Sequence, residues 1–163
     1  MEYFVIKQDN RVTSPLKIDS STIDIDTEEP FVVYADFHPT TTFVDYFCKK
    51  KLFNHYFCVS DALKEMLEIY ADNMTAIPFF VTDKEQKGQK IYWKIDLELQ
   101  DCLEIHSQMR YDNLAIIKEK IKSKYIFKVA FQKQEYLIVS LHLAENILRK
   151  NLCGIQFIPV SLK

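Results

Sequence analysis

The sequence predicts one α+β domain built on a mixed, mostly antiparallel sheet with a few helices. Two observations carry this prediction. Short apolar runs of strand length alternate with polar turns, and a unit of strand, Ser-capped helix and strand occurs twice, at about residues 55–97 and 125–162. A chain of 163 residues fits a single core, because domains cluster near about 100 to 150 residues. We therefore expect residues 1–163 to form one domain.

The first unit has the clearest helix signal. Ser60 follows a strand-like run at the position of a helix N-cap, where its hydroxyl can accept a hydrogen bond from a first-turn amide. Asp61 adds a negative charge that complements the helix dipole. Apolar residues then mark one helical face as far as Tyr70. The strands of this unit are expected at residues 55–59, 77–81 and 90–97.

The second unit repeats this pattern eighty positions later. Ser140 again separates a strand from an amphipathic helix, and Gly154 follows the helix, where a positive φ is often required. Pro159 in the closing strand predicts that this strand lies at a sheet edge. The strands are expected at residues 125–131, 136–139 and 155–160. The repetition indicates either internal pseudo-symmetry or the chance recurrence of a common motif.

The remaining segments predict further strands and two short helices. Apolar runs at 2–7 and 31–35 have the length and composition of strands, and the alternation at 23–26 is typical of a short edge strand or an extended loop. Helical spacing of apolar residues predicts a short helix over 42–50 and another around 114–121.

Composition argues against several classes of protein. The formal charge is −2 and the pI is near 6.1, so the chain lacks the basic surface that neutralises nucleic-acid phosphates. No run approaches the roughly 20 apolar residues of a membrane span, and the N-terminal residues lack the features of a signal peptide. Widely spaced cysteines suit a reducing compartment. We expect a cytoplasmic protein that binds neither nucleic acid nor membrane.

Motifs for catalysis, cofactors or metals are not found in the sequence. The chain has only two glycines, so it contains no phosphate-binding loop. Its four histidines are isolated, and its cysteines have no metal-ligand spacing. Asp36 and His38, beside Pro39, form the most site-like local cluster, although a turn explains them more simply. We therefore expect no cofactor, no metal and no catalytic residues.

A local excess of negative charge lies in the first third of the chain. The segment from Asp19 to Glu29 contains no Lys or Arg. Its carboxylates belong to Asp19, Asp24, Asp26, Glu28 and Glu29. Such a segment is typical of a solvated loop, or of an edge strand whose charges prevent edge-to-edge pairing. The alternative is a surface that faces a basic protein partner.

Several segments, taken in order, resemble a bacterial immunity-protein family of polymorphic toxin systems. The most specific segment has the pattern Leu-x-Gly-Ile-x-Phe-x-Pro-Val and runs from Leu152 to Val160. The other matching segments are Tyr3–Ile6, Cys58–Leu67, Tyr92–Ile95, Asp101–Ser107, Ile126–Val129 and Leu137–Ser140. Together these segments span nearly the whole chain. Residues 8–55 depart from the family pattern.

The resemblance implies a single-domain cytosolic protein that is not an enzyme and that neutralises a cognate toxin domain by binding it. The departing segment is then the expected place of the partner-specific surface. Its candidate residues are Asp19, Asp24, Asp26, Glu28, Glu29, Asp36 and His38. Two other functions stay open at this point. One is a small cytosolic enzyme that uses Asp36 and His38, and the other is an adaptor with no toxin partner.

Overall fold

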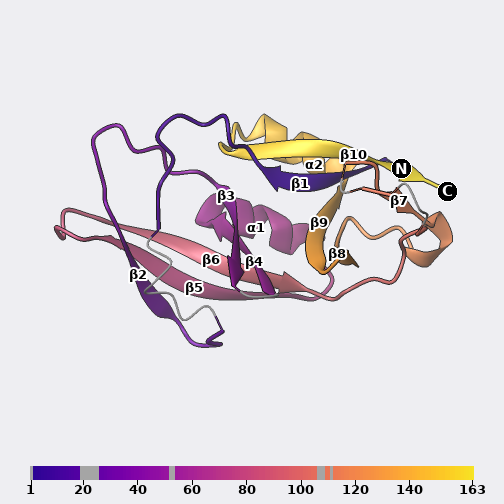
Figure 1. Cartoon of the computed structure of the whole chain (residues 1–163), viewed down its shortest axis with the longest axis horizontal. Helices are drawn as coiled ribbons and strands as arrows, with labels where there is room; N and C mark the ends of the chain where they lie inside the picture. Colours follow the sequence, from indigo (N-terminus) through magenta and orange to yellow (C-terminus); the bar gives the residue numbers. More distant parts are fainter. Residues whose placement is uncertain (1, 19–25, 52–53, 106–108, 111) are drawn as a thin grey trace.

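The computed structural model describes residues 2–18, 26–51, 54–105, 109–110 and 112–163. Within these residues the strands form two five-stranded sheets (Figure 1). The first sheet has the order β7 (Ala115–Ile116), β10 (Ile155–Leu162), β1 (Tyr3–Gln8), β9 (Gln134–Ser140) and β8 (Ile126–Phe131). The second sheet has the order β2 (Phe31–Ala35), β5 (Met74–Asp83), β6 (Gln89–Leu97), β4 (Asn54–Ser60) and β3 (Tyr46–Lys51).

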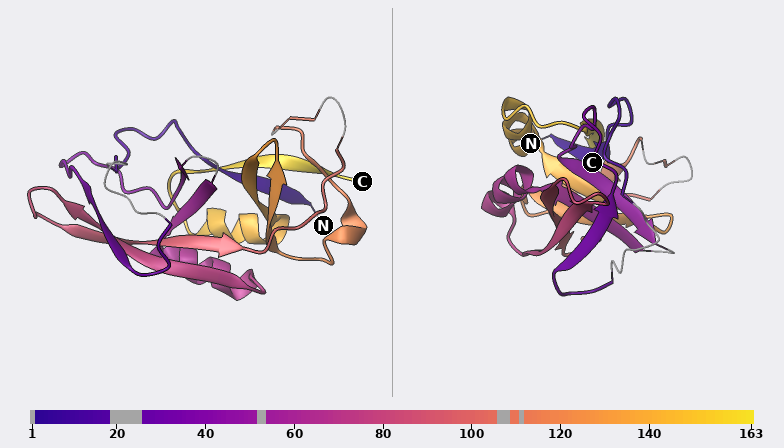
Figure 2. Two further views of the ribbon diagram at one scale, coloured as in Figure 1. Left: turned by 60° about the horizontal axis from the view of Figure 1, so that its bottom comes forward. Right: turned by 90° about the vertical axis from the view of Figure 1, so that its left-hand side faces the viewer.

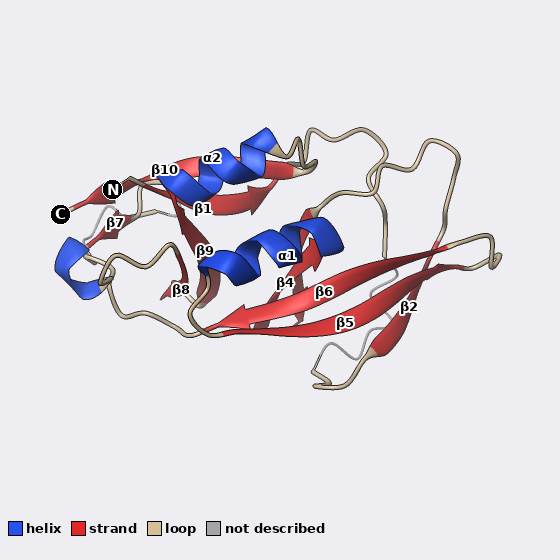
Figure 3. Cartoon of the chain, turned by 180° about the vertical axis from the view of Figure 1, so that it is seen from behind, coloured by secondary structure: helices blue, strands red, loops and turns tan. Residues whose placement is uncertain are grey.

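Two helices complete the α+β fold, which confirms the predicted class. They are α1 (Asp61–Tyr70) and α2 (Leu141–Arg149), and they lie on the same side of the molecule (Figure 3). Both predicted caps are confirmed, because the Oγ atoms of Ser60 and Ser140 each accept a hydrogen bond at 3.3 Å from the backbone N–H of the residue three positions later. Among the described residues, neither helix is long and apolar enough to cross a membrane.

The largest core lies where the two helices meet both sheets. Leu63 and Leu67 of α1 and Leu143 and Ile147 of α2 are buried there. The outer faces of the sheets carry cores of their own. On the first sheet that core includes Tyr3, Phe127, Val129 and Ile138, and on the second sheet it includes Val33, Cys58, Phe79 and Tyr92.

The two sheets have the same strand pairing. In the second sheet β4 pairs with β3 and with β6, β5 pairs with β6, and β2 runs parallel to β5. In the first sheet β9 pairs with β8 and with β1, β10 pairs with β1, and β7 runs parallel to β10. The predicted repeat is therefore an internal pseudo-symmetry of the fold, in which β1 takes the place of β6. The chain ends lie together as a consequence (Figures 1 and 2).

The repeat extends to individual residue pairs. Ser60 is in register with Tyr92, and Ser140 with Tyr3. The backbone N–H of each serine donates to the carbonyl of the residue that precedes the outer strand, Asp45 in one unit and Tyr125 in the other. The prolines correspond as well, with Pro78 opposite Trp93 and Pro159 opposite Phe4. We call residues matched in this way equivalent.

The helix predicted over 42–50 is wrong. Residues Tyr46–Lys51 form β3, which pairs antiparallel with β4. Tyr46 lies in the core between the sheets and Phe47 lies in the core on the opposite face, so adjacent aromatics are buried on both sides of one strand. Phe43 lies before the strand and packs against Phe37. A strand buried on both faces thus produced a spacing that resembles a helix.

The helix predicted around 114–121 is also wrong. Ala115 and Ile116 form β7, and only the three residues Lys118–Lys120 are helical, in a 3-10 turn. Leu114, Ala115 and Ile116 are all buried, because β7 is covered on both faces. Residues 23–25 of the predicted edge strand lie outside the described residues.

The predictions for Pro159 and for Gly154, in and just before the closing strand, have different outcomes. Pro159 does not lie in an edge strand, since β7 flanks β10. However, β7 pairs with β10 only at Ser161 and Leu162, so the ladder on that side starts beyond the proline and needs no N–H from it. The prediction for Gly154 is confirmed, because its φ is +81°.

Candidate functional site

A charged pocket lies where the two sheets meet. Its volume is about 370 Å³. It is lined by Asp26, Glu28, His55, Tyr56, Thr75, Ile77, Lys94, Ile95, Asp96, Lys128 and Glu135. These residues come from β4, β5 and β6 of the second sheet, from β8 and β9 of the first, and from the segment that precedes β2. We call this cavity the charged pocket.

Lys128 joins the two sheets at one end of the pocket. It is only 8% exposed, in the middle of β8, and its Nζ lies 2.7 Å from Asp96 Oδ1 on β6 and 3.2 Å from Glu135 Oε2 on β9. Burial acts to lower the pKa of Lys128, but the hydrogen bonds and charges of these carboxylates outweigh it and raise the pKa. Lys128 therefore stays protonated as a buried bridge.

Lys94 holds the acidic segment against the second sheet. Its Nζ donates to the carbonyl oxygen of Thr27 at 2.6 Å and lies 5.5 Å from the centre of the Tyr56 ring. The Tyr56 hydroxyl in turn donates to Asp26. Burial lowers the pKa of Lys94, and the charge of Asp26 opposes that shift. These contacts place Asp26 and Glu28 at the pocket.

A second pocket of about 440 Å³ adjoins the charged pocket, and His55 and Glu135 line both. Its lining consists of Val5, Ile6, Lys7, Gln8, Asn10, Tyr46, Cys48, His55, Phe57, Gln134, Glu135, Tyr136 and Ile158. This lining combines apolar side chains with polar and charged ones, which are Lys7, Gln8, Asn10, His55, Gln134 and Glu135. We call it the second pocket.

The two pockets are related by the pseudo-symmetry of the fold. His55 and Glu135 are equivalent, so the symmetry exchanges them. The other equivalent lining pairs are Tyr56 with Tyr136, Ile77 with Ile158, Lys94 with Val5, Ile95 with Ile6, Asp96 with Lys7 and Lys128 with Cys48. The fold therefore builds this cavity twice, with four carboxylates and two lysines around the charged pocket and one of each, Glu135 and Lys7, around the second pocket.

The residues predicted for partner binding lie in two places. Asp26 and Glu28 line the charged pocket, and exposed Glu29 follows them. Asp36 lies beyond the other end of β2, where its carboxylate is 3.4 Å from Lys84 Nζ. Asp19 and Asp24 lie outside the described residues.

His38 belongs to a turn beside Asp36. Its N–H donates to Thr41 Oγ1 at 2.9 Å, and its carbonyl accepts from the Thr41 N–H. The structure thus separates the Asp36–His38 pair from Asp26 and Glu28 by the length of β2.

Sequence reasoning missed the lysines and carboxylates on the strands of the pocket. A weak signal for one of them exists, since Lys128 interrupts the otherwise apolar strand β8. Buried lysines are rare unless they are paired, so such a position calls for a carboxylate partner. The partners Asp96 and Glu135 could not be identified, because they lie on other strands.

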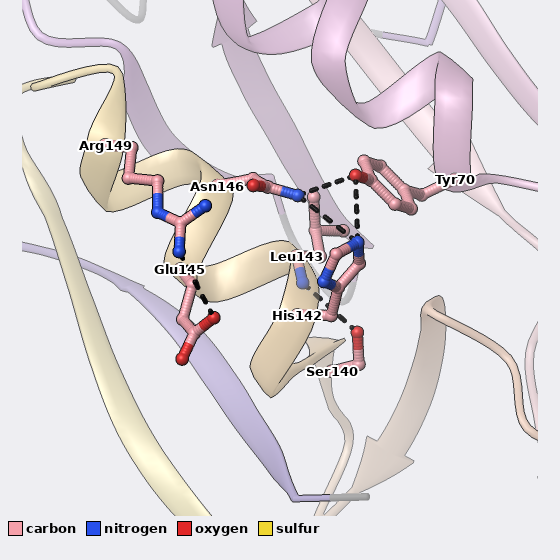
Figure 4. Close-up of polar contacts among 7 residues, drawn as sticks. All are labelled: Tyr70, Ser140, His142, Leu143, Glu145, Asn146 and Arg149. Atoms are coloured by element: carbon pink, nitrogen blue, oxygen red, sulfur yellow. Dashed lines mark hydrogen bonds and ion pairs between the residues drawn. The ribbon is translucent and has the colours of Figure 1, made fainter.

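A separate polar cluster joins the two helices (Figure 4). Tyr70 points from α1 toward α2, where its hydroxyl accepts from Asn146 Nδ2 at 2.6 Å and lies 3.3 Å from His142 Nε2. The rings of Tyr125 and His142 pack around Tyr70. The cluster is exposed and connects α1 to α2, which is a structural role.

Neither metal-binding nor thiol chemistry has support in the part of the chain that the structure describes. No group of three or more His, Cys, Asp or Glu residues there could hold a metal ion. All four cysteines are unpaired. Burial raises the pKa of Cys48 and of Cys102 to about 11, so both are protonated thiols at neutral pH.

No model of a protein family matches the chain, and no curated protein matches it significantly.

Proposed function

We propose that this chain is an immunity protein, which binds a cognate toxin domain directly and so prevents its action. The observation that best supports this proposal is the charged pocket with the acidic segment beside it. The lining contains four carboxylates and two lysines, so the site is acidic although the whole chain is nearly neutral. Such a surface favours a basic protein partner and speeds its association.

The exposed face of β2 supports protein binding as well. Among the described residues β2 is the last strand of its sheet, and only an isolated bridge joins its residue Ala35 to Ile18. Its outward side chains Val32 and Tyr34 are 47% and 46% exposed. Register makes Val32 equivalent to Ala115 of β7, which is only 2% exposed. The equivalent residue is buried in the other unit, so an exposed apolar side chain at this position is particular to β2. Exposed aromatic and aliphatic side chains beside charged residues are typical of protein interfaces.

Co-expression tests the proposal. The toxic domain encoded beside this gene is expressed alone and together with the chain, and growth is compared. We expect the chain to restore growth and to co-elute with the toxic domain in gel filtration. If growth is not restored and no complex is recovered, the immunity function is wrong.

A further inference from the structure

The charged pocket has an excess of negative charge that its own lysines do not balance. Lys128 contacts Asp96 and Glu135, and Lys94 contacts the carbonyl of Thr27 and interacts electrostatically with Asp26 and Glu28, so two lysines face four carboxylates. The Asp96 side chain nevertheless stays 65% exposed and that of Glu135 stays 30% exposed. Both carboxylates therefore offer oxygen surface to the solvent side of the pocket.

The acidic segment adds two more carboxylates at the same cavity. Asp26 is fixed there by the Tyr56 hydroxyl, and exposed Glu28 follows it two residues later. The Lys94 ammonium lies over the Tyr56 ring, so this aromatic surface already accommodates one cation. Carboxylates from both sheets and from this segment thus converge on one cavity.

The second pocket carries a different set of charges. At the positions equivalent to Lys94, Lys128 and Asp96, it has Val5, Cys48 and Lys7. Its lining contains one carboxylate, Glu135, whereas four carboxylates line the charged pocket. The concentration of carboxylates is therefore particular to the charged pocket.

We propose that the charged pocket binds a basic side chain, with a guanidinium or ammonium head, that a protein partner inserts between the two sheets. This inference rests on the proposed function and identifies the chemistry of the contact. The volume of about 370 Å³ lies within the size range of ligand pockets, roughly 300 to 1,000 Å³. Four carboxylates line the pocket together with Lys94 and Lys128, so its side chains carry a net negative charge.

A titration with agmatine, which is arginine without its carboxyl group and carries both a guanidinium and an ammonium head, tests the pocket in the full chain. Amide chemical shifts are followed in the ¹⁵N-labelled protein. Agmatine should cause saturable shifts at His55, Tyr56 and Asp96, with a Kd on the order of millimolar that weakens as salt is added. Butylurea, a neutral molecule of similar length that lacks both cationic groups, should leave these resonances unchanged, as should inorganic phosphate.

A matched pair of variants locates the contact. Glu28→Gln removes a carboxylate that lines the pocket, whereas Glu29→Gln removes the adjacent exposed carboxylate, which does not line it. Glu28→Gln should weaken agmatine binding by about twofold to fivefold, the usual effect of one exposed ion pair. Glu29→Gln should bind agmatine as the wild type does. The same order of effects is expected for the affinity of the toxic domain.

The outcomes separate this inference from the proposed function. Restored growth in co-expression, combined with no saturable agmatine binding, would overturn the basic-side-chain site and leave the immunity function intact. Agmatine binding without restored growth would overturn the immunity function alone. Equal responses to butylurea, or competition by phosphate for the same resonances, would also overturn the basic-side-chain site.

Discussion

Tyr3 and Tyr92 donate the same hydrogen bond in the two halves of the fold. The Tyr3 hydroxyl donates to the carbonyl of Lys124 at 2.9 Å, and the Tyr92 hydroxyl donates to the carbonyl of Val44 at 2.9 Å. Each acceptor lies two residues before the outer strand of its unit, and each tyrosine is in register with the cap serine. β1 is therefore the missing last strand of the second unit, supplied from the opposite end of the chain.

This arrangement predicts that a circular permutant will fold. Tyr3 is in register with Val160, so β10 and β1 could be joined as a hairpin, as β5 and β6 already are. We would insert a copy of residues 83–89 between Lys163 and Met1 and open the chain at the exposed turn between Asn10 and Arg11. Because every strand pairing is kept, the free energy of unfolding should stay within about 2 kcal/mol of the wild type, measured by urea denaturation.

A second permutant provides the control. This permutant has the same junction but is opened between β5 and β6, which separates the equivalent strand in the other unit. It should also fold. If the first permutant lost its cooperative transition while the second kept it, the equivalence of β1 and β6 would be contradicted.

Local signals made part of this fold predictable. The cap serines were identified because a cap is defined by its nearest neighbours in sequence. The role of β1 was not predictable, since Tyr3 meets Ser140 across almost the whole chain. The charged pocket was only partly predictable for the same reason. Asp26 and Glu28 stood out as part of an acidic run, but Lys128 and its carboxylate partners meet only after β8 has paired with β9 and the two sheets have come together.

The two cap serines should differ in their contribution to stability. Both accept a hydrogen bond from the helix, but Ser60 Oγ also donates to Asp45 Oδ1 at 2.6 Å. We expect Ser140→Ala to lower the free energy of unfolding by about 1 kcal/mol and Ser60→Ala to lower it by about 2 kcal/mol. The loss is larger for Ser60→Ala because this change also removes the hydroxyl that donates to Asp45. Urea denaturation measures both. A larger loss for Ser140→Ala would contradict the role given to Asp45.

Gly154 should tolerate no β-branched residue. Its φ is +81°, and a Cβ there would lie 2.6 Å from the Cβ of Val44. Gly154→Val should therefore lower the free energy of unfolding by more than about 3 kcal/mol. Gly88→Ala is the matched control, since a Cβ there first meets Phe37 at 3.4 Å, an ordinary contact. A melting temperature unchanged in Gly154→Val would refute the steric argument.

Charge reversal in the acidic segment should slow association with the toxic domain. Asp24→Lys with Asp26→Lys reverses two charges of this segment, of which Asp26 lines the charged pocket. The association rate at low salt should fall severalfold, and the difference from wild type should shrink as salt screens the interaction. Stopped-flow fluorescence measures both rates. Reversal at Asp36 is the control, because Asp36 lies beyond the other end of β2 and already faces Lys84. Equal slowing by both reversals would exclude local steering by this segment.

Buried thiols predict that the protein loses stability in alkaline solution. Burial raises the pKa of Cys48 and of Cys102 from about 9 to about 11. Above pH 9 the unfolded chain therefore releases thiol protons that the folded chain retains. The free energy of unfolding should fall as the pH rises from about 9 and continue to fall until about 11, where the folded thiols also ionise.

The double variant Cys48→Ala, Cys102→Ala isolates this effect. It should be less stable than wild type at neutral pH, because it loses buried side-chain volume. Its stability should nevertheless fall less steeply between about pH 8 and about pH 10, because the loss that comes from buried tyrosines is common to both proteins and only the two thiols differ. Urea denaturation in the presence of a reductant gives both curves. Parallel curves would show that the two thiols are as accessible to ionisation in the folded chain as in the unfolded one, which would contradict the burial of Cys102 beneath the first sheet.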